Sequence, residues 1–159
     1  MADSRVLVAE GTAVSDDPFN LSRFLSAQDE GQTYQRALAE LSRGRKVSHW
    51  MWFVFPQLAG LGRSATARHY AVRSLAEARA YLGHPVLGAR LIESTHTVLS
   101  QGTSTADDIF GTVDAVKLRS CLTLFVRADP SQATFRKALD AFFDGLPDPA
   151  TEALLNDET

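Results

Sequence analysis

The sequence predicts an all-α fold, a single compact domain of about eight or nine short helices, from two kinds of signal. Ser, Thr or Asp residues, which favour helix N-termini, precede successive runs with apolar residues at helical spacing. Glycine or proline follows most of these runs, and both end helices. With 159 residues, 45% of them hydrophobic, the chain can form one full core. We expect a mobile arm over 1–16, a helical domain over 17–155 and a tail over 156–159.

Two helices are expected at the start of the domain. Asp17 and Pro18 can cap and begin the first, because proline is favoured in the first turn of a helix. The buried face of this helix would comprise Leu21, Phe24, Leu25 and Gln28. Thr33 can cap the second helix, which Gly44 would end.

The segment 44–62, reading GRKVSHWMWFVFPQLAGLG, is the most informative part of the chain, and it contains both tryptophans, Trp50 and Trp52. A short aromatic run fits either a buried strand or a buried helix, and periodicity alone does not decide between them. Ser48 as an N-cap and Pro56 as a stop favour a short helix. In a helix the two indoles would point about 200° apart, whereas in a strand they would share one face.

The remaining helices follow the same signals. Their expected starts are Ser64, Ser74, Pro85, Ser104, Thr112, the region of Phe135, and Asp148. Their expected ends lie near Val72, Gly83, Ser100, Gly111, Asp129 and Gly145. The apolar stripes should meet in one core that includes Trp50, Phe53, Leu91, Leu118, Leu122 and Phe125.

Composition and charge argue against several classes of protein. The net charge of −3 argues against general nucleic-acid binding, which usually requires a basic field. Cys121 is the single cysteine, so no internal disulfide can form. The N-terminus lacks the apolar region of a signal peptide, and no apolar run approaches the ~20 residues that span a bilayer. We expect a soluble cytoplasmic protein without a membrane partner; the sequence does not specify its oligomeric state.

The chain contains the segments DPFNLSRFLSAQ, GRKVSHWMWFVFPQLAGLGRS, EARAYLGHPVLGARL and IFGTVDAVKLRSCLTLF. In these segments, and over most of residues 17–155, it resembles a bacterial family, domain of unknown function 1810. The resemblance implies a mainly helical fold and no established reaction. Some members carry the label calpastatin. That inhibitor is disordered and repetitive, whereas this chain has a dense core pattern and no repeat, so we set the label aside.

A second resemblance, at the level of the fold, is to helical N-glycosidases that act on ADP-ribose-like or phosphorylated nucleoside compounds. Those proteins carry Glu-His-Tyr on a helix, and Arg68, His69 and Tyr70 stand in a similar setting here. Arg68 replaces the glutamate, which removes the acid/base group that the resemblance would imply.

The turn 60–64, reading GLGRS, is a candidate anion site. Glycines let backbone amides approach an anion, and a following helix N-terminus adds partial positive charge. The alternative is a tight turn followed by a Ser64 N-cap. Trp50 and Trp52 could stack on a planar ring, or they could pack in the core. The candidate ligand-binding residues are Arg45, Lys46, Trp50, Gln57, Gly62 and Ser64.

Three residues are candidates for catalysis: His49, Asp114 and Lys117. His49 could act as an acid or base near neutral pH, or its ring could simply bond a nearby carbonyl. Asp114 and Lys117 are neighbours on a predicted helix, either as an exposed ion pair or as an acid and a cation facing a cleft. No metal or other cofactor is expected, because the histidines and the one cysteine lack metal-ligand spacing.

Two functions follow from these residues. The first is an enzyme or binding protein for a small anionic, nucleotide-derived ligand, with its site between residues 45–64 and 114–117. The second is a non-catalytic protein-interaction module whose aromatic block is only core. A polar cleft beside Trp50 would favour the first, and a convex surface with an exposed apolar patch the second. No pattern specifies a reaction, so the sequence does not decide whether the chain is an enzyme.

Overall fold

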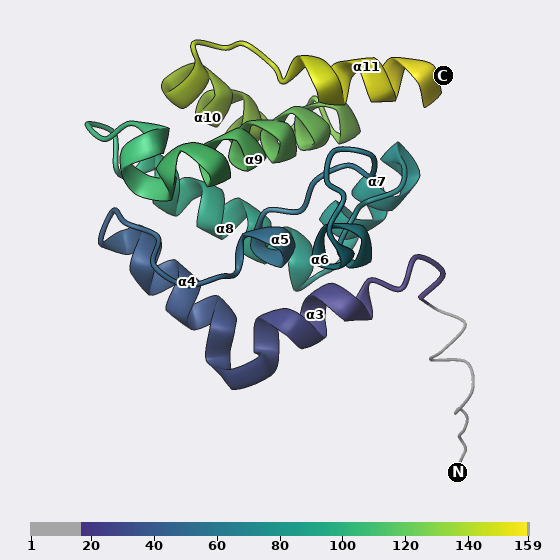
Figure 1. Cartoon of the computed structure of the whole chain (residues 1–159), viewed down its shortest axis with the longest axis horizontal. Helices are drawn as coiled ribbons and strands as arrows, with labels where there is room; N and C mark the ends of the chain where they lie inside the picture. The colour runs from purple at the N-terminus through teal and green to yellow at the C-terminus, as the bar shows by residue number, and fades with distance from the viewer. Residues whose placement is uncertain (1–16, 159) are drawn as a thin grey trace.

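The computed structural model describes residues 17–158, so the arm expected over 1–16 lies outside the described residues, as does Thr159. The all-α prediction is confirmed, and extended pairing within 17–158 is limited to one isolated parallel bridge between Leu58 and Val72. In order, the helices are α3 (Ser22–Asp29), the 3-10 helix η2 (Glu30–Gln32), α4 (Thr33–Ser42), α5 (Met51–Val54), α6 (Ala65–His69), α7 (Leu75–Gly83), α8 (Leu87–Leu99), α9 (Ala106–Ala128), α10 (Ala133–Phe143) and α11 (Pro149–Glu158) (Figure 1).

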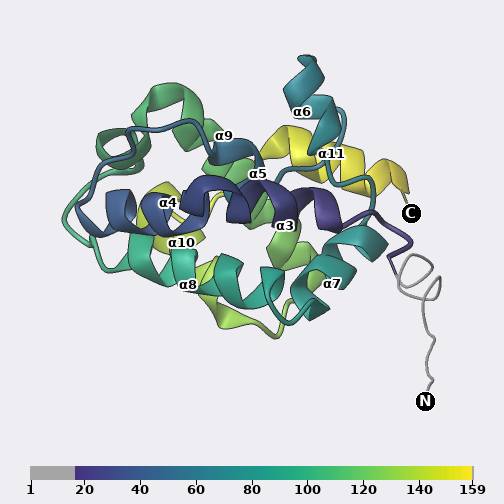
Figure 2. The same ribbon diagram turned by 90° about the horizontal axis from the view of Figure 1, so that it is seen from below.

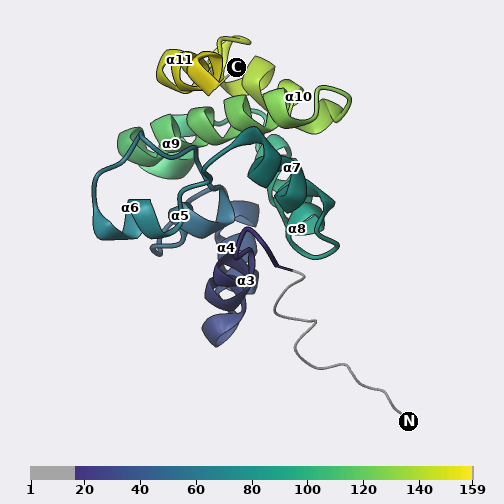
Figure 3. The same ribbon diagram turned by 90° about the vertical axis from the view of Figure 1, so that its right-hand side faces the viewer.

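Helix α9 forms the centre of the fold. Helices α7, α10 and α11 pack against it, and α8 packs against α4, α7 and α10. Figures 1 and 3 place α10 and α11 at one side of the molecule and α3 and α4 at the opposite side. The short helices α5 and α6 belong to the long connection between α4 and α7, and Figure 2 shows α6 projecting from the body near α11.

The predicted core is confirmed for Trp50, Leu91, Leu118, Leu122 and Phe125, each at most 1% exposed. Phe53 is only partly buried, and its ring lies 5.3 Å from that of Tyr70 at the margin of the core. Helix α5 is a single turn, and the side chain that it buries beside Phe53 is that of Val54. Cys121 is fully buried in the same core, and this burial raises the pKa of its thiol well above the usual value.

Hydrogen bonds confirm three of the predicted helix starts. The hydroxyls of Ser64 and Ser74 each accept a bond from the backbone N–H three residues later. The carboxylate of Asp148 does the same at the start of α11. The predicted Thr33 cap is wrong, and Thr33 is instead the first residue of α4. Gln32, with a φ of 59°, turns the chain from η2 directly into α4, so no extended residue precedes the helix.

Helix α9 contains both helices that were expected on the two sides of Gly111. Its N-cap is Thr105 rather than Ser104, because Thr105 and Asp108 exchange side-chain and backbone hydrogen bonds in a capping box. Gly111 has a φ of 79° and a ψ of 161°, a conformation that glycine adopts without strain, and it interrupts the helix. The segment after this interruption carries the candidate residues of α9.

The last helix extends beyond its expected end. Helix α11 runs to Glu158, so residues 156–158, expected as a tail, continue it. None of the helices described over 17–158 combines the length and apolar character needed to cross a membrane.

Candidate functional site

An ion pair joins the basic loop after α4 to α9. The ammonium of Lys46 lies 2.8 Å from one carboxylate oxygen of Asp114, and that of Lys117 lies 3.1 Å from the other. The backbone N–H of Lys46 also donates a 2.7 Å hydrogen bond to the carbonyl of Ile109. The two segments that were expected to share a cleft therefore lie side by side.

Lys46 is held by protein groups. Its side chain is only 8% exposed, and its ammonium also donates a 2.6 Å hydrogen bond to the carbonyl of Ser48. The same nitrogen lies 5.1 Å from the centre of the Trp50 ring. In place of the free ligand-binding cation that was expected, Lys46 is a structural tie between the loop and α9.

Asp114 is an ionised partner of two lysines. Burial alone would raise the pKa of Asp114, but hydrogen bonds and positive charge from Lys46 and Lys117 outweigh burial and lower it. Both carboxylate oxygens are occupied by ammonium groups. This arrangement suits an orienting ion pair better than the general acid/base role expected for Asp114.

Glu40 of α4 fixes Trp50 in the core. The indole N–H of Trp50 donates a 2.9 Å hydrogen bond to the Glu40 carboxylate, which also accepts bonds from the Ser48 hydroxyl and from the backbone N–H groups of Val47 and Ser48. Burial alone would raise the pKa of Glu40, but these bonds lower it to about 2. Ser48 therefore binds Glu40 and does not cap α5. Trp50 is 0% exposed, so its ring packs in the core and offers no face to a ligand, which corrects the stacking role expected for it.

The second tryptophan, Trp52, borders a cavity of about 490 Å³, which we call the Trp52 cavity. Its walls come from the connection between α5 and α6, from α9 and from the start of α11. The apolar part of the wall comprises Trp52, Leu61, Val113, Val116 and Ala150. The polar groups come from Gln57, Thr112, Lys117, Ser120 and Asp148.

Lys117 is the cation that faces the Trp52 cavity. Its ammonium lies 4.3 Å from the centre of the Trp52 ring and 3.1 Å from Asp114, and its side chain is 20% exposed. Contact with an aromatic face and with a carboxylate holds the ammonium in a defined position. Lys117 is therefore a fixed positive charge at the rim of an aromatic hollow.

Gln57 contributes a buried donor to the same cavity. Its side-chain Nε2 is buried and has no hydrogen-bond partner among residues 17–158. The backbone of Gln57 is fixed, because its carbonyl accepts a 2.8 Å bond from the N–H of Val72. An amide in this position carries donor capacity that the surrounding protein does not use.

The glycine turn closes tightly beside Trp52. A Cβ atom at Gly62 would lie 2.6 Å from the Cβ of Ala67 and 3.8 Å from the Trp52 ring, so only glycine fits there without displacing a neighbour. Ser64 is exposed, and its hydroxyl caps α6. Because α6 has only five residues, Ser64 serves the local turn and not an extended helix dipole.

Three candidates lie away from the cavity wall. Arg45, His49 and Ser64 are exposed, and none of them belongs to the lining of the Trp52 cavity. The structure therefore brings Gln57, Gly62 and Lys117 together at this cavity, with Lys46 and Asp114 behind them, and leaves the only histidine among the candidates outside it.

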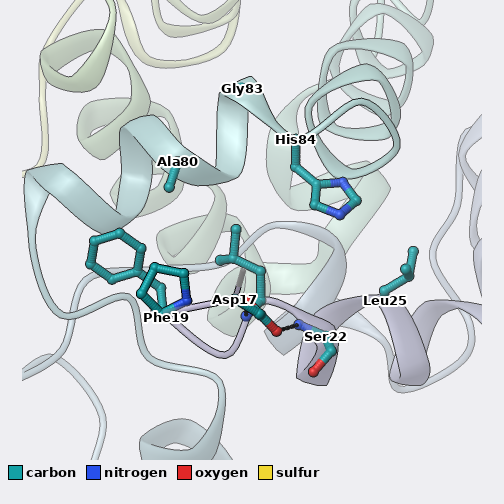
Figure 4. Close-up of a pocket in the computed structure, with 9 residues that line it drawn as sticks. Asp17, Phe19, Ser22, Leu25, Ala80, Gly83 and His84 are labelled. Atoms are coloured by element: carbon teal, nitrogen blue, oxygen red, sulfur yellow. Dashed lines mark hydrogen bonds between the residues drawn. The ribbon is translucent and has the colours of Figure 1, made fainter. Parts of the chain in front are cut away.

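Another hollow, of about 370 Å³, lies between the start of α3 and the end of α7 (Figure 4). Its polar groups are used in capping. The Asp17 carboxylate accepts bonds of 2.7 and 3.1 Å from the N–H groups of Leu21 and Ser22. The Nδ1 atom of His84 accepts two bonds of 3.1 Å from the backbone at the start of α8. This hollow therefore offers few uncommitted polar groups, and the Trp52 cavity is the stronger candidate.

The comparisons with known proteins concern the whole helical domain. The family model described as protein of unknown function (DUF1810) matches residues 18–155. The chain belongs to this family. The crystal structure of the conserved hypothetical protein Rv1873 from Mycobacterium tuberculosis is similar, with 46% sequence identity and a TM-score of 0.85 over 88% of this chain and 99% of that one. No functionally curated protein matches the chain.

For this DUF1810 protein, sequence reasoning gave both tryptophans as possible stacking residues and chose Trp50 for the site, whereas Trp52 lines the cavity. In a helix the two tryptophans point apart, so burial of Trp50 by Glu40 leaves Trp52 at the surface of the core. Thr112, Ser120 and Asp148 were not selected as site residues either. The sequence around these three residues indicates only helix caps and helix faces. Because the site forms where the C-terminal part of the chain contacts α9, no short sequence motif marks it.

Proposed function

We propose that this protein binds a small anionic molecule with a planar ring, of the nucleotide class, in the Trp52 cavity. The observation that carries the proposal is the buried, unpartnered Gln57 amide in the wall of that cavity. A cavity of about 490 Å³ falls within the usual range for small-molecule sites, about 300–1,000 Å³.

The Gln57 amide supplies a reason for a ligand. A buried donor without an acceptor costs about 1–3 kcal/mol, and an acceptor brought by a ligand would recover that free energy. Ring nitrogens and ring carbonyls of a nucleobase are acceptors of suitable size for this position. Most polar side chains in a folded core have a partner, so a buried, unsatisfied amide nitrogen in a residue that lines a cavity favours binding over simple packing.

Trp52 and Lys117 supply the other two features of such a site. The Trp52 ring, with Leu61 and Val116, gives an apolar wall against which a planar group can pack. The Lys117 ammonium, 4.3 Å from that ring, provides positive charge for the anionic part of the ligand. An anion could take over part of the contact that Asp114 makes with Lys117. Nucleotide-like compounds are abundant in the bacterial cytoplasm, the location expected from the sequence.

The two tryptophans make an internal experiment possible. Trp52 borders the cavity, whereas Trp50 is buried and bonded to Glu40. We expect millimolar AMP or ADP-ribose to shift the indole N–H resonance of Trp52 in an NMR spectrum and to leave that of Trp50 unchanged. Trp52→Phe assigns the two signals. If AMP, ADP-ribose and phosphate all leave both resonances in place, or move both equally, the proposal is wrong.

A second candidate function is a protein-interaction module. Val113 and Val116, one turn apart on α9, are 69% and 57% exposed and border the Trp52 cavity. Replacing both with Ser would weaken association with a protein partner. Loss of the ligand-induced Trp52 shifts in the Gln57→Leu variant, which leaves both valines in place, favours the small-molecule function.

A further inference from the structure

One segment of the chain carries positive charge without any acidic residue to compensate it. Residues 41–76 contain six Lys and Arg residues and no Asp or Glu, although the whole chain has a net charge of −3. The segment runs from the end of α4 through α5 and α6 to the start of α7. It therefore forms a basic surface on an otherwise acidic protein.

Within residues 17–158, five of these six cations form no side-chain hydrogen bond and no ion pair, and the guanidinium groups of Arg68 and Arg73 are two of the five. The nearest acidic residue along the chain, Glu77, is bound instead to the guanidinium of Arg23 at 2.7 Å and to the backbone N–H of Arg73 at 3.0 Å. Lys46, by contrast, is neutralised by Asp114.

Both arginines line the same hollow, of about 240 Å³, which we call the arginine pocket. Its other walls come from Leu58, Ala59, Gly60, Gly62 and Ala71. The bridge between Leu58 and Val72 ties the two walls together, with hydrogen bonds of 2.7 and 2.8 Å on either side of it. The pocket therefore has a fixed frame, with two uncommitted guanidinium groups at its edge.

The arginine pocket adjoins the Trp52 cavity. Gly62 belongs to the lining of both, and the absence of a side chain there brings the turn close to the Trp52 ring. Gly60 has a φ of 100°, and a Cβ atom at this position would lie 3.3 Å from Leu154, so the turn rests on α11. Figure 2 shows α6 projecting beside α11, and Arg68 of this helix is exposed.

We propose that Arg68 and Arg73 form a phosphate subsite, which holds the phosphate end of the molecule whose ring occupies the Trp52 cavity. The placement of the ring in the Trp52 cavity rests on the proposed function, whereas the phosphate subsite itself does not. A guanidinium group presents paired N–H donors that match two phosphate oxygens, and two such groups without internal partners can bind a phosphate without breaking an existing ion pair. The glycines at 60 and 62 let the phosphate come close to the backbone.

The experiment compares ligands with and without phosphate. Binding of AMP, adenosine and inorganic pyrophosphate is measured by NMR titration of the amide resonances of Gly60 and Gly62 and of the Trp52 indole. We expect AMP to bind at least about tenfold more tightly than adenosine, in line with the strength of charge-assisted hydrogen bonds. Pyrophosphate alone should move the two glycine amides and leave the Trp52 indole in place.

The variant is Arg68→Gln/Arg73→Gln, which removes both charges and keeps a polar side chain that can donate a hydrogen bond. We expect it to remove most of the affinity advantage of AMP over adenosine, since only Lys117 then faces the anion, to abolish the pyrophosphate shifts and to leave adenosine affinity unchanged. Arg136→Gln, an exposed arginine of α10, is the matched control and should bind all three ligands like the original protein.

The outcomes separate the two proposals. Equal affinity of the original protein for AMP and adenosine, with no pyrophosphate shift, overturns the phosphate subsite and leaves the ring site standing. Pyrophosphate shifts that vanish in the double variant, without any adenosine binding, support the subsite and overturn the ring site. Pyrophosphate shifts that persist in the double variant overturn the assignment to these two arginines.

Discussion

The ammonium of Lys46 lies 2.8 Å from the carboxylate of Asp114, and this contact sets the loop after α4 against α9. The Lys46 side chain is 8% exposed and that of Asp114 19%, so the pair is shielded from water. The contact places the start of the aromatic segment beside the part of α9 that carries Lys117. The geometry of the Trp52 cavity depends on it.

The first prediction concerns this ion pair. Lys46→Ala should lower the free energy of unfolding by about 2 kcal/mol, because Asp114 would lose its most buried partner and Ser48 a hydrogen bond. Urea unfolding followed by circular dichroism measures the change. Lys137→Ala, at an exposed position of α10, is the control and should change stability by less than about 0.5 kcal/mol. Equal losses in the two variants would show that the pair has no special role.

The second prediction is a pH dependence due to Glu40. Its pKa falls from a usual value of 4.5 to about 2 in the folded protein, because hydrogen bonds from Ser48, Val47 and Trp50 outweigh burial. A depressed carboxyl pKa stabilises the fold above pH 4.5, and that contribution is lost as the pH falls towards 2. The contribution amounts to about 3 kcal/mol.

Glu40→Gln provides the test of that assignment. The variant should be less stable at pH 7, and its unfolding free energy should fall less steeply than that of the original protein between pH 4.5 and pH 2. Chemical denaturation at a series of pH values measures both slopes. Parallel slopes would mean that other carboxyl groups cause the acid sensitivity.

The third prediction separates a ligand-binding amide from a structural one. Gln57→Leu removes a buried donor without a partner, so the free protein should become more stable by about 1 kcal/mol. The same variant should lose the ligand-induced shift of the Trp52 indole. A loss of stability in Gln57→Leu would instead show that the amide supports the fold. Thermal unfolding and NMR titration on the same samples measure the two effects.

The fourth prediction concerns the glycine turn. Gly62→Ala would place a methyl group 2.6 Å from the Cβ of Ala67, so the turn must move and the protein should lose about 1–3 kcal/mol. The Trp52 indole resonance should shift as well, because its ring borders Gly62. Gly83→Ala is the control, since a Cβ atom there meets nothing within 4 Å. It should be neutral or slightly stabilising.

Local chemistry made much of the fold predictable. The caps at Ser64, Ser74 and Asp148 depend on side chains that bond the next turn, and the sequence alone displays them. Thr33 has the same side-chain chemistry and does not cap α4. The left-handed conformation of Gln32 makes Thr33 the first residue of the helix instead. Backbone dihedral angles of this kind depend on how neighbouring helices pack, which one short window does not reveal.

The candidate site was predictable in its segments and less so in its residues. The turn around Gly62 and the start of the second half of α9 were both selected, and they do meet. The choice between Trp50 and Trp52 depended on Glu40, which lies on a different helix and buries the first indole. A tertiary hydrogen bond therefore decides which tryptophan faces the cavity. The spacing of residues along the sequence does not predict that bond.

The single cysteine, Cys121, can report the rate at which the core of this protein opens. The thiol is fully buried in α9, and burial keeps it protonated, so a thiol-specific reagent cannot attack it in the folded state. At high reagent concentration, the rate of labelling equals the rate at which the core around α9 opens. Labelling of the Cys121 sulfur can therefore measure the opening rate of the original protein and of each variant described above, without an attached probe.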